Sequence, residues 1–466
     1  MLGMGNMRQW LMNISLVGGW FPAAAFAVVA VLSVTLLVSA AVSKRDGRIL
    51  ATVLPIGVAA VSGMVGYVVA WLLSDVFVVF GVGLGSRAMS WVAAGFAIAG
   101  FAIVHIVLSR GMMRVAAAIL TVFAILAAAI GIDQSYGEYA TIGSLFGEDS
   151  YSQADLTGLA KRKDLITVAQ WRKQAANGTI RNIPANGTVN KIDIPATKSQ
   201  FEARKALVYL PPAALADSKR KPALPVVLML SGQPGSPGRV FQAGGIQTMM
   251  DGYAKTHDGL APIVIAADQL GADSHNTLCV DSKVYGNALT YLTQDVVDWV
   301  KTNLPAAQDA KDWAIAGFSQ GATCSLQIGV NHPDLFGTMI PTDSEIKPTN
   351  GSRQEMIDRF FDGDTTAYEN QVPVNAIRNH APTHQMLIIG AGEKDTTSIR
   401  NVKTIAPVAA KAGMRVAAVE SSGNAHDWHA VQDVLRYGLA VFGHDTGLDG
   451  ANPNLSDYPN LKRITI

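Results

Sequence analysis

The chain has 466 residues, of which 49% are hydrophobic and 16% charged, with a formal net charge of +1. Its length suggests more than one domain, and its near-neutral balance argues against a dedicated nucleic-acid-binding protein, which would carry a basic excess. Two cysteines are too few for a disulfide scaffold or a cysteine-based zinc site. Because soluble domains are typically about 25% charged, part of this chain must be strongly apolar.

The apolar part is the first 132 residues. They hold seven basic and two acidic side chains, a net charge of +5, and the other 334 residues carry a net charge of −4. Four stretches have about the length that a bilayer-crossing helix needs, and they lack the polar face of a helix in a soluble protein. We predict a transmembrane anchor over residues 1–132, without a cleaved signal peptide, and with spans at Phe21–Val42, Ile49–Ser74, Trp91–Ser109 and Val115–Ile132.

Basic residues between the spans predict the orientation of the anchor. Lys44, Arg45 and Arg48 follow the first span, and Arg110 and Arg114 follow the third. Loops rich in lysine and arginine stay in the cytoplasm. We therefore predict a multi-pass plasma-membrane protein whose N-terminus and whole chain after residue 132 lie on the extracytoplasmic side.

His105 is an ionisable residue within the third predicted span. Such residues are functional candidates by default, but no span interior offers an acidic partner. We interpret His105 as structural. The same absence of charge pairs argues against a transporter, so the spans are interpreted as an anchor.

Residues 133–186 are polar and rich in turn residues, and we interpret them as a linker. From residue 187 to 466, β-rich runs alternate with helical runs, which predicts an α/β domain with a mainly parallel sheet and helices on both faces. The expected strands are Val189–Ile194, Ala206–Tyr209, Val226–Leu230, Ile263–Ala267, Trp313–Ala316, Thr338–Pro341, Met386–Ile389 and Val416–Val419, and the expected helices are Tyr291–Asn303, Gln320–Asn331, Ile399–Ala412 and His429–Phe442.

The clearest catalytic signal is the sequence Gly317-Phe318-Ser319-Gln320-Gly321, which matches G-x-S-x-G. It lies between a predicted strand and a predicted helix. Glycines beside the serine suit a tight turn with no room for side chains, and the helix N-terminus favours negative charge that develops there. Ser319 is the predicted nucleophile.

A serine nucleophile needs a base, and the chain order in such domains is serine, acid, histidine. His426 lies between the last predicted strand and the final helix, where the base is expected. His429 is the nearest rival, whereas His380 and His384 precede the strand that should deliver the acid. His426 is the predicted base.

The acid should follow the strand Met386–Ile389. Asp395 is the preferred candidate and Glu393 the alternative, with a role in orienting the imidazole and stabilising the imidazolium. Asp427, next to the predicted base, is expected to have only a local structural role.

Two backbone N–H groups are expected to form the oxyanion hole. One belongs to Gln320, the residue after the nucleophile, and the other to the loop that follows Val226–Leu230. In that loop Gln233 is the expected donor because Pro234 has no N–H, and Gly232 permits a close approach.

Cys324 lies one turn into the predicted nucleophile helix, and Cys279 lies in the loop after Ile263–Ala267, a neighbouring strand in such a fold. An extracytoplasmic domain permits a disulfide, so we hypothesise that they form one beside the nucleophile helix, the alternative being two buried thiols. Asp362-Gly363-Asp364 suggests a metal loop, but no ligand spacing follows it. We predict no metal and no cofactor.

Residues 187–442 resemble the esterase branch of the α/β hydrolases, which includes the antigen 85 mycoloyltransferases, feruloyl esterases and S-formylglutathione hydrolases (esterase D-like proteins). The resemblance lies in Gly317–Gly321, in the helix Tyr291–Asn303, and in His426-Asp427-Trp428, which is similar to the family's His-x-Trp. The membrane-spanning front end resembles anchored actinobacterial members. The resemblance of residues 187–442 implies an α/β hydrolase fold with a Ser319–Asp395–His426 triad.

One departure limits the resemblance. The antigen 85 enzymes have Leu-Asp-Gly-Leu-Arg at the oxyanion loop, where this chain has Leu230-Ser231-Gly232-Gln233-Pro234. A trehalose mycolate substrate therefore does not carry over. The leading hypothesis is a serine esterase or acyltransferase acting on a lipid, glycolipid or other cell-envelope ester, the alternative an inactive hydrolase-fold receptor or scaffold. The sequence predicts no oligomeric state and no nucleic-acid partner.

Overall fold

The computed structural model describes residues 2–42, 48–77, 84–149, 151–160, 162–180 and 182–466. The chain divides into two compact units: Met1–Glu148 together with the loop Ala425–Asp427, and Asp149–Asn424 together with Trp428–Ile466. The loop Ala425–Asp427 joins two elements of the second unit, strand β13 (Arg415–Ser421) and helix α18 (Trp428–Asp445).

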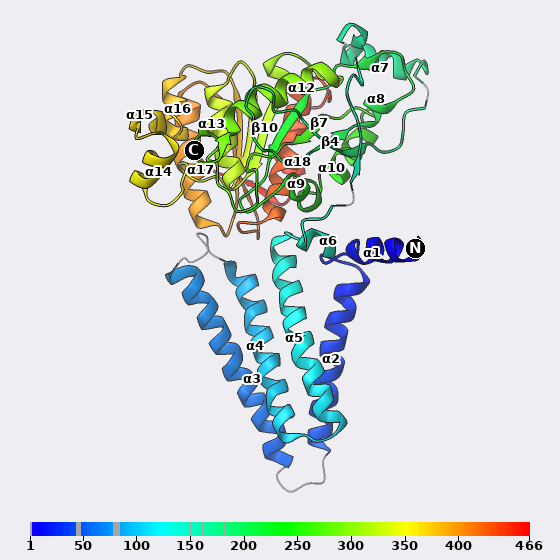
Figure 1. The fold of residues 1–466 in the computed structure, drawn as a ribbon, viewed down its shortest axis with the longest axis vertical. Helices are drawn as coiled ribbons and strands as arrows, with labels where there is room; N and C mark the ends of the chain where they lie inside the picture. The colour runs from blue at the N-terminus through cyan, green and yellow to red at the C-terminus, as the bar shows by residue number, and fades with distance from the viewer. Residues whose placement is uncertain (1, 43–47, 78–83, 150, 161, 181) are drawn as a thin grey trace. The chain divides into compact units, whose positions relative to one another are not determined.

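The first unit is helical (Figure 1). Among the described residues, four helices are long and apolar enough to cross a membrane, as the sequence predicts: Trp20–Ala41, Thr52–Val76, Gly85–Leu108 and Met112–Tyr136. They correspond to α2 (Trp20–Ala41), α3 (Arg48–Trp71) with the π-helical turn η1 (Leu72–Val76), α4 (Gly85–Leu108) and α5 (Met112–Tyr136), with the shorter α1 (Leu2–Met12) and α6 (Ile142–Leu145) outside them.

Helices α4 and α5 extend several residues beyond the predicted spans. Helix α4 starts six residues before Trp91, and α5 continues past Ile132 to Tyr136. Both extensions carry polar side chains, among them Arg87 and Asp133, which the interfacial ends of a membrane helix tolerate. Lys44 and Arg45 lie outside the described residues.

Small residues let the helices of the bundle approach closely. A Cβ on Gly131 of α5 would lie 2.2 Å from the Trp91 ring of α4, and one on Gly100 would lie 2.4 Å from the Ser62 hydroxyl of α3. Such positions are typical of helix packing in membranes. His105 is buried in the bundle, with its ring 4.6 Å from that of Phe101, consistent with a structural role.

The segment expected to be a linker is partly folded into the second unit. Strand β1 (Ser152–Gln153) pairs in parallel with β3 (Thr188–Ile192), and β2 (Leu165–Ile166) pairs with β5 (Lys221–Pro222). Trp171 of α7 (Val168–Ala176) is fully buried in the main core. Residues 149–186 therefore do not form a separate connector, because burying these apolar side chains favours docking.

The second unit is built on a ten-stranded sheet with the order β1-β3-β4-β7-β6-β10-β11-β12-β13-β14. Its central strands run parallel, and β3, β4 and β14 contribute the antiparallel pairs. The remaining strand bounds are β4 (Ala206–Leu210), β6 (Val226–Leu230), β7 (Ile263–Ala266), β10 (Trp313–Phe318), β11 (Thr338–Thr342), β12 (Met386–Gly392) and β14 (Leu461–Arg463), with a separate hairpin of β8 (Asp281–Ser282) and β9 (Gly286–Asn287).

Helices cover both faces of this sheet (Figure 1). Alternate residues of β6 belong to two different cores: Leu228 to the core that also contains residues of α12, α13 and α17, and Met229 to the core that also contains residues of α9, α10 and α18. This alternation explains the continuous apolar strands. The helices are α8 (Pro212–Leu215), α9 (Pro237–Ala243), α10 (Ile246–Lys255), α11 (Ala288–Thr290), π-helical η3 (Tyr291–Asp295), α12 (Val296–Asn303), α13 (Gln320–Asn331), α14 (Arg353–Phe360), α15 (Thr365–Glu369), α16 (Pro373–Asn379), α17 (Thr396–Lys411) and α18, with 3-10 turns at η2 (Arg162–Asp164), η4 (Ala310–Asp312) and η5 (Leu455–Asp457).

Candidate active site

Ser319 lies at the sharp turn between β10 and α13. Its backbone has φ 55° and ψ −118°, a conformation that L-residues rarely adopt. Strain of this kind is often held at functional sites. The serine therefore has the strand-to-helix context of a nucleophile elbow.

The two glycines of the motif are required by close backbone contacts. A Cβ on Gly317 would lie 2.2 Å from the Gly321 carbonyl oxygen, and a Cβ on Gly321 would lie 2.3 Å from that of Ser231. Because both neighbours are backbone atoms, a side chain at either position would force the turn apart. Gly321 also brings the start of α13 against the loop that follows β6.

The carboxyl ends of three adjacent parallel strands meet at this turn. Phe318 of β10 is in register with Thr342 of β11, which is in register with Gly390 of β12. The Ser319 N–H donates to the Thr342 carbonyl oxygen at 3.0 Å. The elbow is thus fastened directly to the neighbouring strand.

The predicted acid and base lie together at this edge. A carboxylate oxygen of Asp395, a carboxylate oxygen of Asp343 and a ring nitrogen of His426 all lie within 4.8 Å of one another. Asp395 is buried, and its Oδ1 accepts the Ser398 N–H at 3.0 Å as the N-cap of α17. Atoms at this spacing could also ligate a metal ion, but beside a nucleophile elbow they suit a proton relay.

Glu393, the alternative acid, makes different contacts. Its carboxylate accepts the Gly423 N–H at 2.7 Å and the Lys462 ammonium at 3.0 Å. The Gly423 hydrogen bond and the Lys462 charge hold the pKa of Glu393 below its ordinary value. These contacts fasten the loop after β13 and favour Asp395 as the acid.

Asp433 of α18 holds the loop that carries His426, a role that the sequence analysis missed. Its buried carboxylate accepts the Ser421 hydroxyl at 2.6 Å and the side-chain amides of Asn424 and Asn460 at 3.2 and 3.3 Å. Asp427 accepts the Ala425 N–H at 2.8 Å, which is a local role. The polar residues of this loop thus fix its path before α18 begins.

The loop after β6 lies against the elbow. A Cβ on Gly232 would be 3.5 Å from the Ser319 Cβ, so the backbone there passes close to the serine. The Gln233 side chain donates to the Ser274 carbonyl oxygen at 3.4 Å. Its N–H and that of Gln320, at the first position of α13 where no intrahelical acceptor exists, stay the expected oxyanion donors.

Gln269, a residue the sequence analysis did not single out, connects these two donor segments. It is fully buried, and its side-chain amide donates to the Ser231 carbonyl oxygen at 2.6 Å and to the Gln320 Oε1 at 3.2 Å. It therefore fixes both sides of the expected oxyanion hole. Only the folded sheet, which places β7 beside β6, reveals this bridge.

Cys279 and Cys324 form a disulfide, with their Cα atoms 5.7 Å apart. The Gln320 side-chain amide lies 3.2 Å from the Cys324 sulfur and 3.8 Å from the Cys279 sulfur. The disulfide thus supports the residue that follows the nucleophile.

We expect the double substitution Cys279→Ser/Cys324→Ser to lower the free energy of unfolding by about 4 kcal/mol, because the bridge closes a loop of 45 residues. Urea unfolding of the purified full chain, followed by near-ultraviolet circular dichroism, measures the change. The variant should match the reduced wild-type protein. Equal stability of the variant and the oxidised protein would contradict the prediction.

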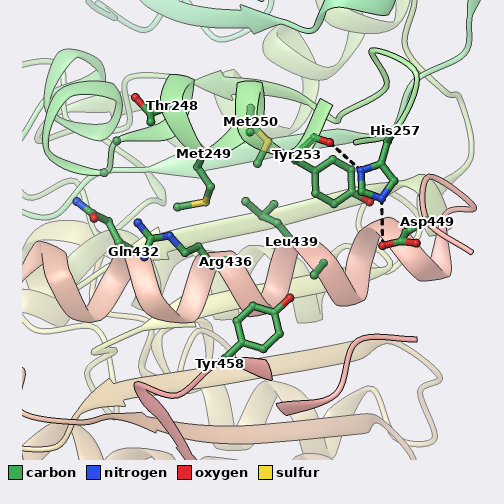
Figure 2. A pocket seen from close by; sticks show the side chains of 14 residues that line it. Thr248, Met249, Met250, Tyr253, His257, Gln432, Arg436, Leu439, Asp449 and Tyr458 are labelled. Atoms are coloured by element: carbon green, nitrogen blue, oxygen red, sulfur yellow. Dashed lines mark hydrogen bonds and ion pairs between the residues drawn. The ribbon is translucent and has the colours of Figure 1, made fainter. Parts of the chain in front are cut away.

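A separate hollow of about 670 Å³ lies between α10 and α18, and none of the predicted catalytic residues lines it (Figure 2). The His257 Nε2 lies 3.2 Å from an Asp449 oxygen, and its Nδ1 lies 2.7 Å from the Tyr253 carbonyl oxygen. Burial acts to raise the pKa of Asp449, but hydrogen bonds from Ala451 and His257 hold that pKa below its ordinary value. We interpret the His257–Asp449 contact as structural, because it holds the segment that follows α18 against the chain after α10.

The chain is similar in sequence to a known protein family and to a bacterial protein. The profile of the family described as "Putative esterase" matches residues 198–438. An uncharacterized protein of Corynebacterium glutamicum is 32% identical over 333 residues, which cover 70% of this chain and 74% of that protein.

Solved structures that are similar to the chain share little sequence with it. An S-formylglutathione hydrolase from Agrobacterium tumefaciens is 16% identical, covering 57% of this chain and 98% of that one, with a TM-score of 0.46. A ferulic acid esterase from Anaeromyces mucronatus is 18% identical, covering 56% of this chain and 91% of that one, with a TM-score of 0.42.

Proposed function

Because the chain belongs to the esterase family, we propose that it is a membrane-anchored serine esterase or acyltransferase with an extracytoplasmic catalytic domain. The observation that carries the proposal is the strained turn at Ser319, at the sheet edge where Asp395 and His426 lie together. Nucleophile, acid and base follow three parallel strands, β10, β12 and β13, in the chain order of this fold.

The proposed reaction passes through an acyl-enzyme. The Ser319 oxygen attacks the ester carbonyl carbon while His426 accepts the serine proton, and Asp395 stabilises the imidazolium. The N–H groups of Gln233 and Gln320 stabilise the oxyanion. Collapse breaks the ester C–O bond, and the imidazolium protonates the leaving alcohol. Water or an acceptor hydroxyl, deprotonated by His426, then attacks the acyl carbon; the acyl C–O bond to Ser319 breaks, and the imidazolium returns its proton to the serine oxygen. No cofactor or metal enters these steps.

The substrate is proposed to be a lipid, glycolipid or other cell-envelope ester. Support comes from the four apolar helices, which would hold the second unit beside a membrane. The test is lipid mass spectrometry of membranes that contain wild-type protein or Ser319→Ala, following free acids and acylated products together. Free acid alone indicates an esterase, and a new acylated product indicates an acyltransferase. No difference between the membranes would refute the proposed lipid substrate.

The proposed extracytoplasmic location of the catalytic domain is supported by the basic residues of the loops between the predicted spans. We expect Lys219→Cys, at an exposed position of the second unit, to react with a membrane-impermeant maleimide in intact cells. Arg110→Cys, exposed between α4 and α5, is the matched control and should react only after permeabilisation. The native cysteines do not interfere because they are joined as a disulfide. The opposite labelling pattern would invert the proposed topology.

A further inference from the structure

Asp343 is a second carboxylate beside the predicted catalytic base. It directly follows β11, between the strand that ends at the elbow and the strand that leads to Asp395. The Asp343 N–H donates to the Gly390 carbonyl oxygen at 2.9 Å, and its Oδ1 accepts the Gly392 N–H at 2.9 Å. Both contacts hold its carboxylate at the catalytic edge of the sheet.

The backbone and burial of Asp343 are unusual for a turn residue. It has φ 54°, in the left-handed region, where glycine costs less than any L-residue. The residue is only 1% exposed. A buried carboxylate is costly unless charge or hydrogen bonds compensate it. The turn alone would not require an acidic residue at this position, so the Asp343 carboxylate is expected to have a further role.

His426 is the group that can compensate the buried Asp343 carboxylate. Oxygens of Asp343 and Asp395 and a nitrogen of His426 lie within 4.8 Å of one another. Two nearby carboxylates stabilise a protonated imidazole more than one does. Because His426 gains a proton when Ser319 attacks, the second carboxylate would favour that step.

We propose that Asp343 is a second positioning carboxylate for His426, able to replace Asp395 in part as the acid of the triad. This inference rests on the proposed function, since it concerns the same base. It implies that the two acids are redundant. Loss of one leaves a carboxylate for the imidazolium, and loss of both leaves none.

The test compares Asp343→Asn, Asp395→Asn and the double variant, using full-length protein and a p-nitrophenyl ester. Asparagine keeps the acceptor for the Gly392 N–H and removes the charge. We expect Asp395→Asn to lower kcat about 10²-fold. The double variant should lower kcat about 10⁴-fold, which is the loss seen when the sole carboxylate of a catalytic triad is replaced by an amide. In Asp343→Asn, the acidic limb of the pH profile of kcat/KM should move to lower pH by about 1 unit. The reason is that losing a negative charge beside His426 lowers the pKa of this base.

A purely structural Asp343 would not move the acid limb, so an unmoved limb overturns the proposal. A double variant no slower than Asp395→Asn also overturns it. If Asp343→Asn fails to fold, Asp343→Gly replaces it, since glycine adopts φ 54° without steric cost. A first measurement must show that the wild-type protein hydrolyses the ester and that Ser319→Ala does not. The absence of this hydrolysis refutes the proposed function, whereas an unmoved limb with that activity intact refutes the role of Asp343 alone.

Discussion

Replacing Ser319 by alanine is expected to lower kcat for ester hydrolysis by about 10⁶-fold, the loss seen when a serine-hydrolase nucleophile is removed. The substitution deletes the only atom that can form the acyl-enzyme at the elbow between β10 and α13. The oxyanion donors and the substrate contacts would remain. A residual acceleration of about 10³-fold over water is therefore expected.

Purified full-length protein, a p-nitrophenyl ester and a fluorophosphonate probe measure this effect. Wild type should be labelled at one serine and Ser319→Ala should not. Ser325→Ala is the matched control, because Ser325 lies on the same helix and its hydroxyl donates only to the Ala322 carbonyl oxygen at 2.8 Å. Equal labelling of wild type and Ser319→Ala would refute Ser319 as the nucleophile, and a wild-type protein that is not labelled would favour an inactive receptor or scaffold.

The sequence was most informative where structure is determined locally. The G-x-S-x-G turn needs glycine at 317 and 321 because backbone atoms lie 2.2 to 2.3 Å from any Cβ there, and that requirement is visible in five consecutive residues. The membrane helices were equally visible, because a bilayer imposes length and apolar composition directly. Their ends were not, since polar residues such as Arg87 belong to the helix but interrupt its hydropathy.

Residues that act through sheet adjacency could not be found from one sequence. Asp343 and Gln269 each lie far along the chain from the groups they contact, whereas Asp433 of α18 holds the nearby loop residues Ser421 and Asn424. Asp343 meets His426 only because β11 lies between β10 and β12, and Gln269 meets Ser231 only because β7 pairs with β6. The folded part of the expected linker was missed for the same reason, since β1 has two residues and its partner is β3.

His426→Ala is expected to lower kcat about as much as Ser319→Ala, by about 10⁶-fold, because a serine hydroxyl without a base is a poor nucleophile. His429→Ala, at the second residue of α18, is the matched control and should retain nearly full activity. Comparable losses in both histidine variants would mean that the loop, rather than the base, is being disturbed.

The double variant Ser319→Ala/His426→Ala gives the sharpest result. Independent contributions would multiply to a loss of about 10¹²-fold, whereas members of one catalytic unit act together and their losses do not add. We therefore expect the double variant to be no slower than either single variant, as measured by hydrolysis above the uncatalysed rate. A further loss in the double variant would show that His426 acts on another group, and the proton relay from Ser319 would have to be abandoned.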